Sequence, residues 1–316
     1  MDQLINDIRQ KTLQHNQNNI TRTIAYLDYY QHFPEIEWAF LASMVSRNAG
    51  WNMTDLKTHT YQNLLSSRML DYLFMTYERA NWFIFSDAFP QLLLYKHSVE
   101  QQKPLFHLLK YFYVSTFMID EWMHFWFHQN QKRLRTALII NEQNLIQKPV
   151  IEEPFFKWRV FRNIPYVLQE KIHLNAVLFP TITGKLYGLS IKKFTKLTKR
   201  IETGKMLAAI LFSDSLYEEF KDFALTVNPT GTRFEYEQFS GQKQIGAPSL
   251  EQSYPTIEHE NNVRKDWYVH SGMKEKWWNN VSITPRPIGE HFYKKRNLLK
   301  RVANLREKIS YMKNGG

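Results

Sequence analysis

The sequence predicts a mainly α-helical protein with a bundle-like core, an irregular aromatic-anchored arm and a basic C-terminal helix. Three observations predict this fold class. Apolar residues recur at helical spacing through residues 20–135, the 316 residues include only 11 Gly and 12 Pro, and 15% of the chain is aromatic. So few turn-forming residues argue against an all-β sandwich or barrel, and the aromatic content indicates a core built largely from rings.

The first helices are expected soon after a Gln- and Asn-rich start at residues 1–19. Thr21 and Thr23 are candidate N-caps for the first of them. Pro34 suits the first turn of the next helix, which carries apolar residues at four-residue spacing. Gly50 marks the expected end of that helix, because glycine commonly terminates helices.

Longer helices are expected to follow. Apolar residues lie on nearly every side between residues 64 and 95, which predicts one buried helix, or two helices broken near Asn81 and Pro90. Pro104 begins another helical run at residues 105–138. Several long helices in succession indicate a bundle-like core.

The middle of the chain has a less regular pattern. Residues 155–180 are compatible with a helix, residues 181–188 with a turn, residues 190–200 with a basic helix or loop, and residues 206–225 with a helix. Residues 228–287 then combine Gly, Pro, Trp and Tyr, which predicts an irregular arm held by aromatic anchors. The expected division is a helical core at 1–227 and, at 228–316, an arm and C-terminal helix packed on that core as one structural unit.

The last predicted helix, at residues 288–313, has an apolar seam on a basic background. The seam follows four-three spacing at Leu298, Val302, Leu305, Ile309 and Met312. This helix can dock on the protein's own core, pair with a second copy or bind an anionic partner. A homodimer through this helix is therefore one expectation.

Composition narrows the classes of function. The chain has no cysteine, which excludes disulfides, Cys-ligated zinc, iron–sulfur clusters and thiol catalysis. A formal net charge of +11 favours anionic partners, either nucleic acid or an anionic membrane surface, through residues 190–200 and 290–308. The start of the chain lacks an apolar signal core, and residues 105–127 carry too many charges for a membrane span. We therefore expect a cytoplasmic protein.

The most distinctive segment is residues 35–56, EIEWAFLASMVSRNAGWNMTDL, where an apolar run passes into a polar cluster. One interpretation is a pocket for an anion or small molecule, since Arg offers a planar fork and Asn offers both donors and acceptors. The other is a helix-ending loop in which Arg47 pairs with Asp55. The candidate ligand-binding residues here are Arg47, Asn48, Trp51, Asn52 and Asp55.

Two carboxylates in an apolar segment extend this candidate site. Glu78 and Asp87 lie in ERANWFIFSDAFPQLLLY at residues 78–95. Buried carboxylates need partners, so pairing with Arg47 or Arg79 is expected, and a catalytic role requires an accessible cleft. A shared site requires that Arg47 and its neighbours converge with Glu78, Asp87 or Glu121.

A metal site is a separate hypothesis. Glu121 and His124 form Glu-x-x-His, His128 extends the same helical face, and Glu170 with His173 repeats the motif. Residues three apart on a helix can ligate one metal, and two such motifs with two further glutamates, for which Glu37 and Glu78 are candidates, make a di-iron bundle. The alternative is a polar edge of an aromatic helix. No cofactor is indicated, because no Gly-x-Gly-x-x-Gly, Walker or Gly-x-Ser-x-Gly pattern is present.

The segments NITRTIAYLDYYQHFPEIEWAFLASMVSRNAGWNMTDL at 19–56 and ERANWFIFSDAFPQLLLY at 78–95 resemble the YppC-like family of Bacillus-type bacteria. This is a domain-of-unknown-function family, so the resemblance implies a bacterial cytosolic protein and transfers no catalytic residues. The leading hypothesis is a non-enzymatic binding or structural protein with an anionic partner. The alternative is a helical enzyme or small-ligand-binding protein with a pocket near Arg47, Asn48 and Asn52, with metal dependence through Glu121 and His124.

Overall fold

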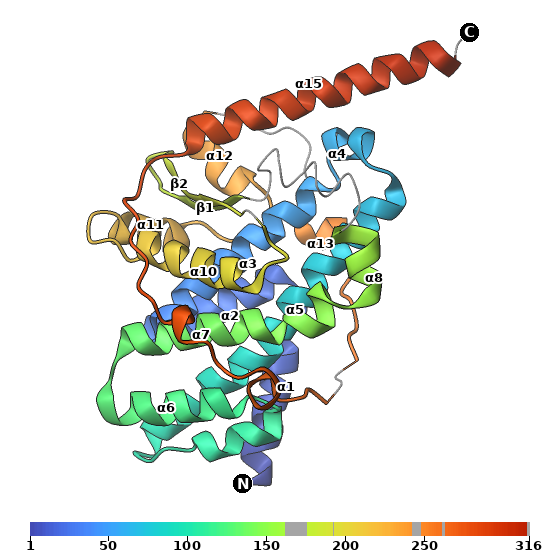
Figure 1. The fold of residues 1–316 in the computed structure, drawn as a ribbon. Helices are drawn as coiled ribbons and strands as arrows, with labels where there is room; N and C mark the ends of the chain where they lie inside the picture. The colour runs from blue at the N-terminus through green and yellow to red at the C-terminus, as the bar shows by residue number, and fades with distance from the viewer. Residues whose placement is uncertain (162–175, 192, 242–247, 261–262, 315–316) are drawn as a thin grey trace.

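The computed structural model describes residues 1–161, 176–191, 193–241, 248–260 and 263–314. The prediction of a mainly α fold is confirmed, since helices surround one small two-stranded sheet in this part of the chain (Figure 1). The α-helices are α1 (Asp2–His15), α2 (Asn19–His32), α3 (Glu37–Asp55), α4 (His59–Leu64), α5 (Ser67–Glu100), α6 (Thr116–His128), α7 (Gln131–Leu145), α8 (Pro154–Phe156), α10 (Leu197–Leu211), α11 (Tyr217–Thr226), α12 (Phe234–Ser240), α13 (Leu250–Ser253), α14 (Trp267–Ser271) and α15 (Gly289–Asn314). Short 3-10 or π turns are η1 (Phe106–Phe112), η2 (Gln147–Ile151), η3 (Lys157–Phe161) and η4 (Glu275–Trp277), and the strands are β1 (Ala176–Pro180) and β2 (Leu186–Ser190).

Helix α3 lies at the centre of the fold. It packs against α2, α5, α7, α10 and β1, and most of its residues are buried. The expected end at Gly50 is wrong, because α3 continues to Asp55. A Cβ on Gly50 would stand 3.3 Å from the Cα of Gly231, so this glycine permits close approach of a loop and does not terminate the helix.

The neighbours of α3 also differ in detail from the prediction. Helix α2 is capped by Asn18, whose side chain accepts from the backbone of Ile20 and Thr21, and not by Thr21 or Thr23. Helix α5 runs without a break through Asn81 and Pro90, as in the single-helix alternative. Its length links the main aromatic core around α3 to a smaller cluster that includes Met53 and Trp82.

Residues 176–190 form a β-hairpin where the sequence predicted a helix followed by a turn. Strands β1 and β2 are antiparallel, with Leu178 opposite Gly188. Every residue of β1 is buried, so the strand reads as a continuous apolar run. Such a run does not show the alternation that distinguishes a half-exposed strand from a helix.

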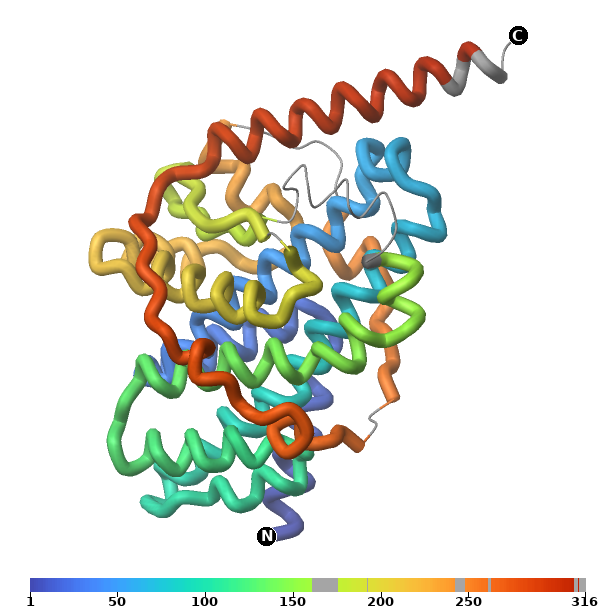
Figure 2. Tube along the Cα trace, viewed as in Figure 1, coloured from blue at the N-terminus to red at the C-terminus, as the bar shows by residue number. Residues whose placement is uncertain are grey.

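The arm crosses the helical body after α11. Figures 1 and 2 show it passing along one side of the body, from α13 through α14 and η4 to α15. Trp267 and Trp277 are buried anchors, and the ammonium group of Lys205 on α10 donates to the carbonyls of Trp277 and Asn279. The predicted irregular, aromatic-anchored arm is therefore confirmed.

Helix α15 follows the arm and extends beyond the body of the molecule (Figure 1). It packs against α4, and Arg306 Nη1 donates to the carbonyl of Leu64 at 2.8 Å. Across the ranges given above, no helix combines the length and the apolar character needed to cross a lipid bilayer.

Candidate functional site

Arg47 points into the protein and is held by the loop and helix around α12. Its Nε donates to Glu235 Oε2 at 2.5 Å, its Nη2 donates to the carbonyl of Val227 at 2.5 Å, and its guanidinium lies 4.6 Å from the Phe223 ring centroid. Both partners of the ion pair are almost fully buried. The Arg47 side chain therefore ties α3 to the arm and presents no free donor fork at a surface.

The expected pair between Arg47 and Asp55 is wrong. Asp55 Oδ2 accepts from Arg233 Nε at 2.8 Å, and Asn52 Oδ1 accepts from Arg233 Nη2 at 2.9 Å. Trp51 packs edge-on against Tyr236, with ring centroids 4.9 Å apart. The second half of α3 thus forms the surface on which α12 packs, and α12 lies some 180 residues further along the chain.

Asn48 on α3 forms hydrogen bonds with the backbone of strand β1. Its Nδ2 donates to the carbonyl of Leu178 at 2.7 Å, and its Oδ1 accepts from the Leu178 N–H at 2.8 Å. The side-chain amide therefore acts as a neighbouring strand residue would, which satisfies an edge of β1 that is buried.

Glu78 and Asp87 pair with neither Arg47 nor Arg79. Glu78 accepts two bonds from Arg22, at 2.5 and 2.9 Å, and one from His259 at 3.1 Å. Burial alone would raise the pKa of Glu78, but Arg22 and His259 outweigh it and the pKa is lowered. Asp87 lies 3.5 Å from Arg264, and here burial prevails, so the pKa of Asp87 is raised.

The metal candidates do not assemble a ligand set in the described chain. Glu121 accepts two bonds from Arg133, at 2.7 and 2.8 Å. The rings of His124 and His128 lie with centroids 4.4 Å apart and planes tilted by 41°, and His128 is exposed while His124 is half-buried. No group of three potential ligands from His, Asp or Glu occurs among the described residues, and Glu170 and His173 lie outside them.

The candidate residues therefore do not converge. Glu78, Asp87 and Glu121 each pair with a different arginine, and none of them meets Arg47. A shared site would require Arg47 to meet at least one of these carboxylates in a single cleft, and such a cleft is not formed. The polar residues of α3 instead organise the packing of the hairpin and α12, and Asn48 and Asn52 also line a small cavity between α3 and its neighbours.

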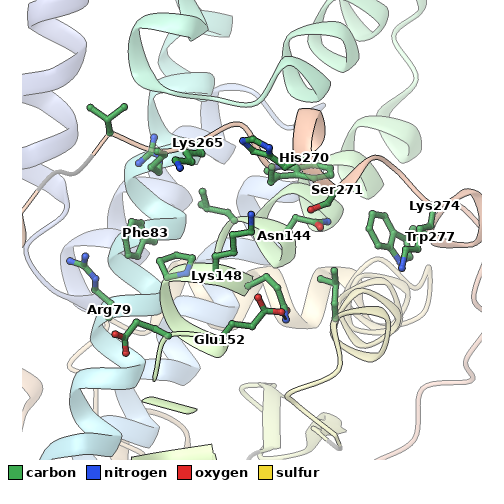
Figure 3. Close-up of a pocket in the computed structure, with 18 residues that line it drawn as sticks. Arg79, Phe83, Asn144, Lys148, Glu152, Lys265, His270, Ser271, Lys274 and Trp277 are labelled. Atoms are coloured by element: carbon green, nitrogen blue, oxygen red, sulfur yellow. Dashed lines mark hydrogen bonds between the residues drawn. The ribbon is translucent and has the colours of Figure 1, made fainter. Parts of the chain in front are cut away.

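A pocket of about 550 Å³ lies beneath the arm (Figure 3). Arg79 and Phe83 of α5 stand on one side and Lys274 with Trp277 on the other, while Lys148 lies between them. Five cationic residues and two acidic ones line it, and the complete charged set is Arg79, Lys148, Arg264, Lys265, Lys274, Glu152 and Glu153.

Pro149 determines the backbone conformation of the turn that lines the floor of this pocket. Pro149 has no N–H to donate to the carbonyl of Leu145, so α7 cannot continue as an α-helix. The chain widens into the π turn η2, in which the Ile151 N–H donates to the carbonyl of Ile146 at 3.2 Å. This turn carries Lys148 at the pocket, where it is exposed.

Helix α15 presents its predicted apolar seam to solvent. Leu298, Val302, Leu305, Ile309 and Met312 are 40% to 73% exposed. The helix docks through a different face, on which Leu299 is 5% and Ala303 0% exposed. In the other predicted basic segment, 190–200, Lys193 and Lys196 are exposed but Arg200 is buried and donates to Gln143.

Comparison with known sequences matches residues 14–297 to a family described as protein of unknown function, DUF2515. The chain belongs to this family. It is also 46% identical over 299 residues to the uncharacterized protein YppC of Bacillus subtilis (strain 168), an alignment that covers 93% of each chain. The resemblance noted at residues 19–56 and 78–95 is thus confirmed. No solved structure matches the chain.

The DUF2515 match spans the whole pocket beneath the arm and ends just before the exposed seam of α15. Sequence reasoning missed this pocket, because its lining comes from segments at 79–83, 144–153, 197 and 263–277. Pro149 indicates that the helix is interrupted, and Lys148 beside it supplies a cation there. Nothing in the sequence shows that this turn lies next to the arm.

Proposed function

We propose that this chain is a bacterial cytoplasmic protein that binds an anionic lipid surface through α15. The observation that carries the proposal is an exposed apolar seam flanked by cations. Helix α15 contains eight Lys or Arg residues and two Glu. An amphipathic helix of this kind lies in a membrane interface with its apolar side in the lipid and its cations at the headgroups.

The seam and the docked face are separate. At about 100° per residue, the five seam positions fall within a stripe about 80° wide, whereas Leu299 and Ala303 lie about 100° to 140° from Leu298. Helix α15 can therefore remain docked on α4 while the seam contacts another surface. Burying one exposed leucine is worth up to about 1.5–3 kcal/mol.

The charges beside the seam favour an anionic surface over a second copy. Arg301 and Lys308 lie on one flank of the seam, and Arg306, whose Nη1 also donates to the carbonyl of Leu64, lies on the other. In a two-stranded coiled coil these flanking positions face the partner helix, so two copies would set cations against cations. Near anionic lipid each cation contributes about 1 kcal/mol. Nucleic acid would satisfy the cations but would leave the apolar seam in water.

Vesicle cosedimentation tests the proposal. The full chain is expected to sediment with phosphatidylglycerol vesicles, to remain in solution with phosphatidylcholine vesicles, and to bind less as salt rises. Leu305→Asp with Ile309→Asp is expected to abolish binding. The matched control is Leu13→Asp with Leu225→Asp, which changes two exposed leucines elsewhere and is expected to leave binding intact.

Three results would contradict the proposal. Equal binding to both kinds of vesicle would remove the anionic requirement. Tight binding to duplex DNA that is insensitive to Leu305→Asp would favour a phosphate backbone. A concentration-dependent dimer that Leu305→Asp dissociates would favour a second copy.

The pocket beneath the arm supports a second candidate function, the binding of a small anionic ligand. Its volume of about 550 Å³ falls within the range typical of ligand sites. Lys148 and Lys265 make no ion pair within the described chain, so both ammonium groups are available. Titration with phenyl phosphate, with phenol as the uncharged match, tests this function. Lys148→Ala is expected to weaken phenyl phosphate binding, and Lys103→Ala is the control.

A further inference from the structure

A smaller, partly open cavity lies between the helices and shares no lining residue with the pocket beneath the arm. It measures about 170 Å³ and is bounded by α2, α3, α5, α7, α10 and the hairpin. Most of its wall is apolar, and the main apolar residues are Leu41, Val45, Ile84, Ile146, Val177 and Leu207. A cavity with such a wall suits a small organic molecule better than a cluster of water.

Two residues that line this cavity each lack one kind of partner within the described chain: the half-buried Glu142 has no cation, and the Tyr26 hydroxyl has no hydrogen bond. The Glu142 carboxyl accepts from Trp38 Nε1 at 3.2 Å and from Gln143 Nε2 at 3.0 Å, and no cation pairs with it among the described residues. The hydroxyl of Tyr26, a residue only 3% exposed, has no hydrogen-bond partner in the same part of the chain. Buried polar groups are normally paired, so both point to an absent ligand.

The two residues line the same cavity, and the charge of Glu142 acts on the Tyr26 hydroxyl. Burial is the main cause that raises the pKa of Tyr26, and the charge of Glu142 is the next. Burial also raises the pKa of Glu142 to about 7. Among the described residues Glu142 has no cationic partner, whereas Glu78, Asp87 and Glu121 each pair with an arginine.

We propose that this cavity binds a small primary amine, with its ammonium group between Glu142 and Tyr26 and its hydrocarbon part against the apolar wall. The ammonium supplies the missing cation to the carboxylate and a donor to the Tyr26 oxygen. For size, an apolar cavity of about 150 Å³ holds benzene. A six-carbon ring with one amino group therefore fits a cavity of about 170 Å³.

The other charged side chains around the cavity do not replace the amine. Arg22 is engaged by Glu78, and Arg200 is engaged by Gln143, which separates it from Glu142. Tyr77 also lines the cavity, and burial raises its pKa, so it is neutral at physiological pH. A carboxylate ligand would face the charge of Glu142, and an alcohol would leave that charge without a cation.

Calorimetric titration with cyclohexylamine, and with cyclohexanol as the uncharged match, tests the inference. Cyclohexylamine is expected to bind at least about tenfold more tightly than cyclohexanol, and Glu142→Gln to remove that preference. Tyr26→Phe is expected to weaken binding by about threefold to tenfold. Glu218→Gln, on the exposed face of α11, is the control and is expected to change nothing.

Proton release provides an independent readout. Below pH 7 the carboxyl must lose its proton when the ammonium binds, so the heat of binding is expected to depend on the ionisation enthalpy of the buffer. That dependence is expected to vanish in Glu142→Gln. Equal affinity for cyclohexanol and cyclohexylamine, or unchanged amine binding in Glu142→Gln, would overturn the inference. Failure of wild-type protein to bind cyclohexylamine at millimolar concentration would also overturn it. None of these results depends on vesicle binding by α15.

Discussion

Replacement of Glu142 by Gln is expected to stabilise the protein above neutral pH. In the folded protein burial raises the pKa of Glu142 from 4.5 to about 7, so the folded state holds a proton that the unfolded chain releases. Stability from this group is therefore present below about pH 4.5 and is lost as pH rises to about 7. The difference of the two pKa values is worth about 3 kcal/mol. Because Glu142 is partly exposed, we expect about 2 kcal/mol in measurement.

Urea unfolding of wild type and Glu142→Gln between pH 5 and pH 8.5 measures this effect. The two proteins are expected to differ least in free energy of unfolding at the acid end, because the folded Glu142 is then protonated and, like Gln, neutral. As pH rises, the free energy of unfolding of the variant is expected to exceed that of wild type by a growing amount. This difference is expected to level off above pH 7. A difference between the proteins that does not change with pH would refute the reasoning, because it would mean that Glu142 is ionised throughout. Glu218→Gln serves as the surface control.

Three further changes test the packing directly. Arg47→Met is expected to lower the free energy of unfolding by about 3–5 kcal/mol, because it leaves the buried Glu235 carboxylate without its cation; urea titration measures it. Gly231→Ala is expected to cost about 2 kcal/mol or more in the same assay, because φ is +74° and the new Cβ would stand 2.6 Å from the Cβ of Leu250. Leu305→Asp is expected to change thermal stability by less than about 0.5 kcal/mol, since this side chain is 59% exposed.

Local patterns were sufficient where neighbours in sequence decide the structure. The four-three spacing from Leu298 to Met312 predicts a helix with a seam, and α15 has both. The apolar surroundings of Asn81 and Pro90 allow a single helix, and α5 is continuous because its buried packing outweighs one lost backbone bond.

Sequence patterns gave wrong predictions where contacts with distant segments of the chain determine the structure. Gly50 is a plausible helix end by sequence, yet its role is to admit the backbone near Gly231. Asp55 is near Arg47 in sequence, yet its partner is Arg233. The residues around Asp55 do not indicate a contact with a residue so far away in the sequence. The buried strand at residues 176–180 has no alternation, so its apolar run does not reveal its period.

The ion pairs between the early helices and the arm have a consequence for the order of events during synthesis. Arg47, Asp55 and Asp87 leave the ribosome early, but Glu235, Arg233 and Arg264 are translated long afterwards. Until then the nascent helices must keep these three charges in water, since burying an unpaired charge is costly. We therefore expect a ribosome-bound chain ending at residue 227 to remain unfolded around α3 until the arm has been synthesised. The last third of the chain thus sets the time at which the first third can finish folding.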